Sequence, residues 1–249
     1  MALTRRTFLQ STAAAMPGVI AANSFASDNR VAPSDRINVA MIGCGKMANS
    51  YHIPQLLQQP DVQLVAVCEV DATRREWAAD RVNKKYSEGK KDFQGCATYV
   101  DFRQVIARED VDAVCIATPD HWHAIPLIES CKAGKDVYCE KPLTLTIAES
   151  KACIDAARKY KRIVQTGSQQ RSGVFGPFRE AIELIHSGRL GKIHRVTVGV
   201  GDPSVDCDLP EEEMEPGLDW DMWLGCAPER AYNSILSPRG VHNHFPAWR

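Results

Sequence analysis

Two apolar runs in the sequence lead into residues of types that could bind a ligand. The run over residues 37–42 leads into a glycine turn, and a later run ends in Glu69. Gly43 permits a sharp turn, Gly45 leaves the backbone open to a pyrophosphate, and Ala48 keeps the next helix close to the sheet. Glu69 lies about 20 residues beyond the turn, where a carboxylate can bind both ribose hydroxyls. The residues predicted to surround a dinucleotide here are Gly43, Cys44, Gly45, Lys46, Met47, Ala48 and Glu69.

A lysine follows another apolar run and could move a proton. Glu140-Lys141-Pro142 comes directly after the run over residues 136–139. Lys141 could hold a substrate oxygen and transfer a proton while hydride moves to or from a nicotinamide. Glu140 could steady the lysine ammonium, and Pro142 would define the turn. Taken alone, the tripeptide is better explained as an exposed loop.

Two histidines follow a third apolar run, in Thr118-Pro119-Asp120-His121-Trp122-His123. Ligands of parallel sheets bind beyond the carboxyl ends of the strands, which is where this loop would lie. Pro119 would end the strand, and His123 would begin the next helix. A capped loop with solvated histidines is the alternative to a role beside the nicotinamide or substrate. The residues predicted at this part of the site are Thr118, Pro119, His123, Glu140 and Lys141.

These residues need a sheet with strands that end together, and the apolar pattern predicts one. The expected strands are continuously apolar, as in a parallel sheet covered on both faces, and they alternate with helical patterns. This alternation is typical of a doubly wound α/β sheet. Pro54 should kink or split the first helix. The expected strands cover residues 37–42, 63–68, 113–117, 136–139 and 163–166, and the expected helices cover residues 46–59, 72–86, 102–107, 124–133 and 147–160.

The pattern changes after Gly167. Residues 178–187 predict an amphipathic helix, and residues 193–200 alternate like a strand with one covered face. Residues 202–249 show little periodicity and suggest a loop of a second domain. With one strand of a second sheet visible, we expect the sequence to be part of a longer protein. The expected domains are a signal and linker over residues 1–34, a dinucleotide-binding domain over residues 35–166, and the start of a second domain over residues 167–249.

The N-terminal residues resemble an export signal. Thr4-Arg5-Arg6-Thr7-Phe8-Leu9-Gln10 is a twin-arginine pattern, residues 13–22 are small and mildly apolar, and Ser24-Phe25-Ala26 fits a signal peptidase site. A disordered tail with two arginines is the alternative. We expect export through the twin-arginine pathway, with the mature protein in the periplasm or another exported location and no membrane anchor.

Composition excludes several classes of function. The 249 residues carry a formal net charge of -1 without a basic patch, so nucleic-acid binding is not expected. The nine cysteines show no paired framework, and three of them, Cys68, Cys115 and Cys139, lie in apolar runs as small core residues do. No metal site is expected, because the histidine pairs are isolated and no Cys-x-x-Cys motif is present.

In combination the motifs resemble the Gfo/Idh/MocA oxidoreductases, named for glucose–fructose oxidoreductase and inositol dehydrogenase. The resemblance rests on the glycine turn, Glu69, the Thr-Pro-Asp-His-x-His loop and Glu140-Lys141-Pro142, and it covers nearly all of the chain after Val31. It implies a Rossmann doubly wound parallel sheet followed by an α/β domain with an open antiparallel sheet, incomplete in this sequence. Two further segments resemble the exported members, namely Gln169-Gln170-Arg171-Ser172 and Leu218-Asp219-Trp220-Asp221-Met222-Trp223-Leu224-Gly225.

The resemblance also implies roles for residues. Lys141 matches the family's catalytic lysine, and His123 matches a position near the cofactor that we also count as a catalytic candidate. The cofactor is NAD or NADP, and the substrates are pyranoses or cyclitols. Arg171 could contact substrate hydroxyls or a cofactor phosphate, although a structural ion pair explains it equally well. A homo-oligomer is expected for the full-length protein.

Some features depart from the family pattern. Glu69 stands where the family usually has aspartate, which preserves the ribose contact and favours NAD by repelling a 2′-phosphate. Arg74 and Arg75 could soften that preference, although a solvated first helical turn is the simpler interpretation. The family's aspartate and histidine from a later helix have no counterpart before Arg249, because His242 and His244 come too early.

Three functions remain open from the sequence. The first is an NAD(P)-dependent oxidoreductase acting on a sugar or cyclitol hydroxyl or carbonyl, with Lys141 as the proton shuttle. The second is an NAD-dependent glycosidase of the same family, with no net redox change. The third is a non-catalytic protein that binds a nucleotide or a sugar, against which Lys141 argues, because a pure binding protein does not need that lysine.

Overall fold

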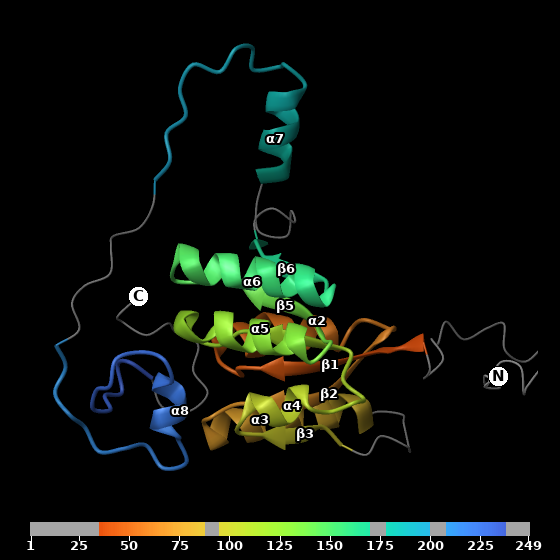
Figure 1. The fold of residues 1–249 in the computed structure, drawn as a ribbon. Coiled ribbons are helices and arrows are strands. Elements are labelled where there is room, and N and C mark those ends of the chain that lie inside the picture. The colour runs from red at the N-terminus through yellow and green to blue at the C-terminus, as the bar shows by residue number, and fades with distance from the viewer. Residues whose placement is uncertain (1–34, 88–94, 170–177, 200–207, 238–249) are drawn as a thin grey trace, which may run out of the picture.

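The computed structural model describes residues 35–87, 95–169, 178–199 and 208–237. Their centre is a six-stranded, wholly parallel sheet in the order β3-β2-β1-β4-β5-β6 (Figure 1). The expected doubly wound Rossmann sheet is thereby confirmed. The strands are β1 (Ile37–Ile42), β2 (Val62–Cys68), β3 (Ala97–Tyr99), β4 (Ala113–Ile116), β5 (Asp136–Glu140) and β6 (Val164–Gly167).

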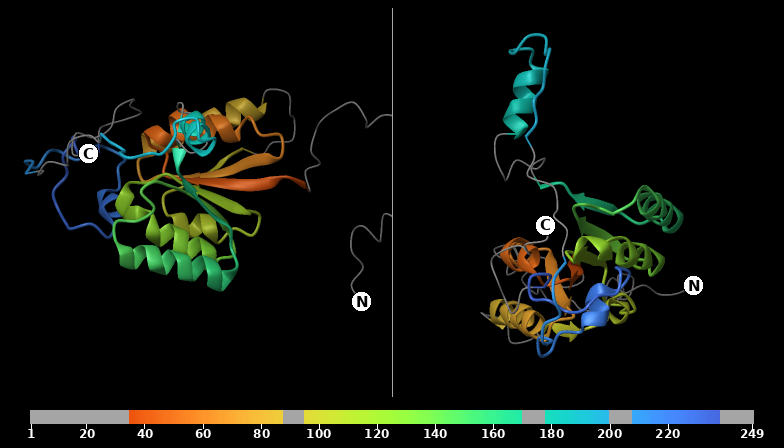
Figure 2. Two further views of the ribbon diagram at one scale, coloured as in Figure 1. Left: turned by 90° about the horizontal axis from the view of Figure 1, so that it is seen from above. Right: turned by 90° about the vertical axis from the view of Figure 1, so that its left-hand side faces the viewer.

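Helices cover both faces of the sheet (Figure 2, left). One face packs against the segment that follows the glycine turn and against α3, and the other packs against α4, α5 and α6. The helical segments are η3 (Ala48–His52), α2 (Ile53–Leu56), α3 (Ala72–Ser87), α4 (Phe102–Ile106), η4 (Asp120–Trp122), α5 (Ala124–Lys132), α6 (Ile147–Tyr160), α7 (Phe178–His186) and α8 (Trp220–Leu224). None of the described helices is both long enough and apolar enough to cross a membrane.

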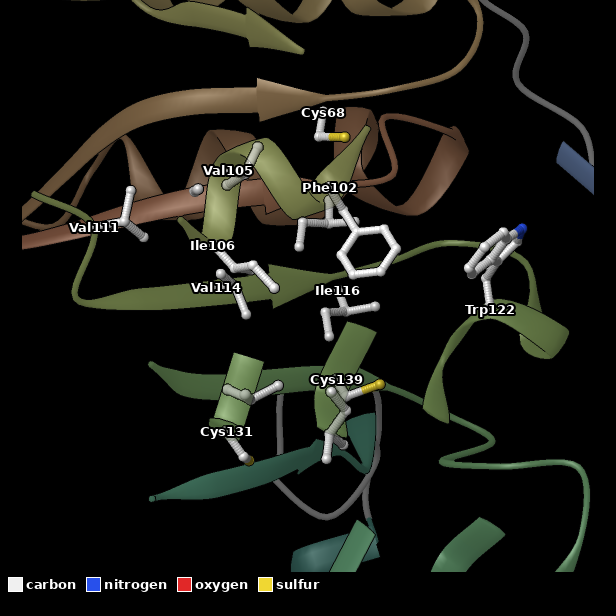
Figure 3. Packing of buried hydrophobic residues seen from close by; sticks show 14 of the residues in the cluster. Cys68, Phe102, Val105, Ile106, Val111, Val114, Ile116, Trp122, Cys131 and Cys139 are labelled. Atoms are coloured by element: carbon white, nitrogen blue, oxygen red, sulfur yellow. The ribbon is translucent and has the colours of Figure 1, made fainter. Parts of the chain in front are cut away.

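The continuously apolar strands contribute side chains to two hydrophobic cores, one on each face of the sheet. Along β1, Ala40 and Ile42 pack into the cluster under α4, α5 and α6, whereas Val39 and Met41 pack into the cluster under α3. Figure 3 shows the first cluster, with Trp122 beyond the C-terminal ends of the strands. The predicted core cysteines are confirmed as buried: Cys68, Cys115 and Cys139.

The strand register places the predicted site residues in one row. Ile42 at the end of β1 is opposite both Cys68 of β2 and Ile116 of β4, and Ile116 is opposite Cys139 of β5. Because these parallel strands end together, the loops that follow them emerge at the same edge of the sheet. The glycine turn, Glu69 and the two loops predicted to carry chemistry are therefore neighbours.

Two elements differ in detail from the sequence prediction. The helix expected over residues 46–59 contains a π-helical segment, η3, before the short α2, and Pro54 lies at the beginning of α2. Pro54 therefore divides this segment, as predicted. The three-residue strand β3 was missed, because so short an edge strand has too few residues to show a pattern.

Residues 178–199 differ most from the prediction. The helix α7 forms, but none of its residues is buried, and it stands away from the sheet (Figure 2, right). The strand expected over residues 193–200 is wrong for its described part, since residues 193–199 form no strand and Val196 is 75% exposed. A strand needs a neighbour for its backbone hydrogen bonds, and no described segment pairs with this one.

Residues 208–237 are more ordered than the predicted loop. They form α8 and a small core of Leu218, Trp220, Leu224, Tyr232 and Leu236, against which Val70 packs from the end of β2. Ala72 N donates to Gly217 O at 3.0 Å, and Asp219 N donates to Val70 O at 3.2 Å. This segment therefore folds back onto the carboxyl edge of the Rossmann sheet.

Candidate functional site

Within the glycine turn, Gly43 packs closely against the loop after β4, whereas the space beside Gly45 is open. Gly43 has φ of 86°, and a Cβ there would lie 2.7 Å from the backbone nitrogen of Thr118. A side chain at Gly43 would therefore collide with the loop that follows β4. A Cβ on Gly45 would meet no atom within 4 Å. The turn thus has the predicted shape, with a bare backbone at Gly45 that faces open space.

The backbone of Cys44 is held from both sides. Its N–H donates to Glu69 Oε2 at 2.7 Å, and its carbonyl accepts from Asn49 Nδ2 at 2.6 Å. The other oxygen of Glu69 accepts from Asp71 N at 3.0 Å. These bonds fix the glycine turn relative to the tip of β2. Asn49 was not singled out from the sequence, because a lone asparagine one helical turn after a glycine loop has no distinctive spacing.

A dinucleotide fits the residues at this edge. The open backbone at Gly45 precedes a helical segment with N–H groups that have no partner within the helix. Glu69 lies at the tip of the second strand, as ribose recognition requires. The hydroxyl of Thr118 is buried and has no hydrogen-bond partner among the described residues. An additional polar group bound at this edge would satisfy it.

His123 joins the loops that follow β4 and β5. Only 1% of its surface is exposed, and its ring nitrogens face two backbone carbonyls, Thr118 O at 3.0 Å from Nε2 and Pro142 O at 2.5 Å from Nδ1. The buried ring therefore contacts both loops and links them. The predicted catalytic role of His123 stays a prediction, and the geometry shows a bridge between loops.

Lys141 lies where the sequence places it, and Glu140 contacts its backbone. Lys141 is exposed just beyond β5, and the Lys141-Pro142 peptide bond is cis. Glu140 is buried, and its carboxylate accepts from the backbone N–H of Lys141 at 3.1 Å. Burial alone would raise the pKa of Glu140, but the His52 ring and the Lys141 N–H outweigh it and hold this pKa below its usual value. Glu140 thus accepts a hydrogen bond from the lysine backbone, and the charge of Lys141 also helps to lower the pKa of Glu140, which is consistent with the predicted support of the ammonium.

Comparison with known proteins identifies the family. A model of the family described as "Oxidoreductase family, NAD-binding Rossmann fold" matches residues 37–168, which is more than half of the chain. The chain belongs to the Gfo/Idh/MocA oxidoreductases. Members of this family bind a nicotinamide dinucleotide, so the cofactor of the site is NAD or NADP.

Relatives of this Gfo/Idh/MocA protein include proteins named as glycosyl hydrolases and proteins named as dehydrogenases. A protein of Shewanella putrefaciens named "Glycosyl hydrolase family 109 protein" is 30% identical over 222 residues, covering 77% of this chain and 46% of that protein. Myo-inositol 2-dehydrogenase from Lactobacillus plantarum is 28% identical with a TM-score of 0.55, over 64% of this chain and 43% of that one. A probable dehydrogenase from Thermotoga maritima is 26% identical with a TM-score of 0.54, over 63% and 43%. The chain thus spans about half the length of the curated relatives it matches.

In this Gfo/Idh/MocA protein, the segment over residues 218–226 packs against the loop that carries His121 and His123. His121 Nε2 lies 2.8 Å from Trp223 O, and Trp122 Nε1 donates to Met222 O at 2.9 Å. Burial lowers the pKa of His121 below its usual value. The histidine is thus packed against the returning segment rather than solvated. The sequence showed both segments but not that they meet, because about 100 residues separate them.

The two arginines after Glu69 have separate environments. Arg74 is buried, where it lies 4.0 Å from Asp71 Oδ2 and donates to Ser237 Oγ at 3.4 Å. The interpretation of Arg74 as part of a solvated turn was therefore wrong, because the returning segment covers it. Arg75 is half-buried and donates to Glu69 O at 2.6 Å.

Several predicted features lie outside the described residues. These are Arg171, the twin-arginine pattern, and the pair His242 and His244. Among the residues that the structure does describe, no group of three or more histidine, cysteine or acidic side chains could hold a metal ion.

Proposed function

We propose that this protein transfers hydride between a nicotinamide and a hydroxyl or carbonyl group of a sugar or cyclitol. The observation that carries the proposal is the row of loops at one sheet edge. The glycine turn contacts the loop after β4, and His123 ties that loop to the one that carries Lys141. Lys141 therefore stands exposed beside a site that accepts a dinucleotide.

Each group at this edge has a distinct task. When bound, an oxidised nicotinamide would supply the acceptor for the hydride that leaves the C–H bond of the substrate alcohol. Lys141 takes the hydroxyl proton while the carbonyl forms, and it returns that proton in the reverse direction. Glu69 binds the ribose hydroxyls and disfavours a 2′-phosphate, so NAD is the preferred cofactor. His123 keeps the two loops at their mutual distance.

The names of relatives support the substrate class. The structural relative from Lactobacillus plantarum acts on myo-inositol, as its name states. A polyhydroxylated ring presents several alcohols to one lysine, so small displacements would select which carbon is oxidised. Arg171 is proposed as a further contact to substrate hydroxyls. We also propose that the protein is exported by the twin-arginine pathway to the periplasm and is a homo-oligomer at full length.

Replacing Lys141 tests the proposal. Lys141→Met in the complete protein should reduce NAD-dependent oxidation of an inositol or sugar about 1000-fold, because proton transfer typically contributes a factor of this order. NADH affinity, followed by nicotinamide fluorescence, should not change. Lys151→Met on the exposed surface of α6 is the matched control. Turnover that survives Lys141→Met unchanged would rule out the proton-shuttle role.

A second function is favoured by the curated relatives, which are named as glycosyl hydrolases. In a glycosidase of this kind, the nicotinamide would be oxidised and reduced within each cycle, so no net NADH would form. Incubation of the complete protein with NAD and a panel of p-nitrophenyl glycosides distinguishes the two. Release of p-nitrophenol without net NADH supports the glycosidase, whereas net NADH formed from a free inositol or sugar supports the dehydrogenase.

A further inference from the structure

A buried pair connects the helix after the glycine turn with the end of β5. His52, the last residue of η3, places its Nε2 2.9 Å from Glu140 Oε1. The Glu140 side chain is only 5% exposed and that of His52 only 12%. A buried carboxylate is costly unless several partners compensate for its lost hydration. The two atoms therefore face one another at a place that is closed to solvent.

The second oxygen of Glu140 reaches the residues beyond the sheet edge. Oε2 accepts from the Lys141 backbone N–H at 3.1 Å and from Gln169 Nε2 at 3.4 Å. One carboxylate thus contacts the first helix, the loop after β5 and the segment after β6. It therefore contacts the backbone at the point where the chain leaves β5 and the Lys141 side chain begins.

The surroundings leave this carboxylate little freedom. The ring of Tyr138 packs edge-on against His52, with 5.3 Å between centroids. A Cβ on Gly167 would lie 2.6 Å from the Tyr138 hydroxyl and 2.9 Å from Glu140 Oε1, so a larger residue at the end of β6 would displace the ends of both side chains. On the other side, the pair borders a cavity of about 750 Å³, which Gln55 and Gln165 also line.

We infer that His52 and Glu140 are positioning residues for Lys141, linking the glycine-turn helix to the lysine loop through one carboxylate. The inference rests on the proposed function insofar as Lys141 is the proton shuttle. Neither side chain touches the reacting atoms in this arrangement. The glycine-turn helix faces the dinucleotide, so the pair joins the segment that binds the cofactor to the segment that moves the proton.

The contact to the Lys141 amide can be observed without any substrate. In protein labelled with 15N-lysine, the Lys141 amide resonance is assigned by its loss in Lys141→Arg. His52→Leu and Glu140→Ala should shift this resonance and speed its exchange with solvent. Gln55→Ala, which changes another wall of the same cavity, should leave it in place. A Lys141 amide that is unmoved in both variants overturns the inference.

Kinetics separate positioning from simple stability. Because small displacements of a catalytic group can lower turnover about 100-fold, His52→Leu should lower kcat to that degree while the Kd for NADH is retained. His52→Gln keeps an N–H donor near the same place and should recover most of the activity. Glu140→Gln, which keeps the shape, provides a second test if Glu140→Ala does not fold.

The outcomes distinguish this inference from the proposed function. If turnover depends on Lys141 but is indifferent to His52→Leu and Glu140→Gln, the positioning role is overturned and the proposed function is retained. If the Lys141 amide shifts in the variants while even the unaltered protein turns over no inositol, sugar or glycoside, the coupling stands and the proposed function fails. A parallel loss of NADH affinity and kcat in folded variants indicates general disruption and also counts against positioning.

Discussion

The helices α5 and α7 have similar lengths and similar apolar content, yet they differ completely in burial. In α5, Leu127 and Cys131 are fully buried against the sheet. In α7, Phe178 is 53% exposed and Ile182 is 48% exposed. An amphipathic pattern defines which face of a helix could be covered, but only a neighbouring surface covers it. The short connections from β4 and to β5 hold α5 on the sheet, whereas no described strand follows α7.

Residues 208–237 show a third arrangement. Their apolar side chains, including Trp220 and Tyr232, form a separate small core, and Val70 from the loop after β2 packs against it. Docking also depends on polar contacts with the loop around His121 and Trp122. The segment is thus held by a few contacts at the sheet edge, and it should be less stable than the sheet and more stable than α7. The following predictions test this ranking.

The largest effect is expected at the glycine turn. Gly43→Val should lower the free energy of unfolding by about 3 kcal/mol, because a Cβ collides with backbone atoms and the positive φ strains any other residue. Urea unfolding measures the loss. The matched control is Gly45→Val, which meets open space and should fold normally but bind NADH poorly. Normal NADH binding by Gly45→Val would contradict the placement of the pyrophosphate.

A smaller loss is expected in the returning segment. Leu224→Ala should remove about 2 kcal/mol from the docking of residues 208–237, since Leu224 is buried in their core. Hydrogen exchange should then increase in this segment while β1 and β4 stay protected. Met222→Ala, at a half-buried position of the same helix, is the control. Equal deprotection of the sheet strands would mean that the segment and the sheet unfold as one unit.

Removal of the acidic residue should affect the cofactor more than the fold. Glu69→Ala leaves the N–H groups of Cys44 and Asp71 without their acceptor and removes the ribose contact, so NADH affinity should fall about tenfold. Competition against NADH by NADP should improve relative to NAD, because the repulsive charge is gone. Fluorescence titration measures both effects, and an unchanged ratio would argue against Glu69 as the selective residue.

A pH dependence is expected from His121. Burial lowers the pKa of His121 in the folded state below its ordinary value of 6.5, so the unfolded chain takes up the proton first as the pH falls. Docking of residues 208–237 should therefore be unaffected above that value and weaken as the pH drops through it towards the folded-state pKa. Hydrogen exchange at about pH 7.5 and about pH 5.5 tests this, and His121→Gln should remove the dependence.

The smallest effect is expected in α7. Ile182→Ala should change the free energy of unfolding by less than about 0.5 kcal/mol, because the side chain is half exposed and belongs to none of the buried clusters of the described residues. Leu127→Ala in α5 is the matched buried variant and should cost about 3 kcal/mol. A loss at Ile182 comparable to that at Leu127 would show that α7 is covered in solution.

The parts of the site that lie within one strand–helix–strand unit were predictable. Gly43, Gly45 and Glu69 were located from spacing alone, and the structure places all three at the same edge. Residues that act across the fold were not predictable in the same way. Asn49 and His52 have no local signal, since their importance comes from partners that approach from other strands. Glu140 was identified beside Lys141, but its contact with His52 was not, for the same reason.

Local sequence patterns predict the parallel sheet, the edge at which its loops emerge and the family to which the chain belongs. Apolar runs and turn residues act over a few positions, so their consequences can be read locally. Three features are visible only in the folded protein: Glu140 turns inward to His52, His123 bridges two loops, and residues 208–237 return to cover His121 and Arg74. Those contacts join residues from distant segments, and burial and hydrogen bonding select them only after the sheet has brought the segments together.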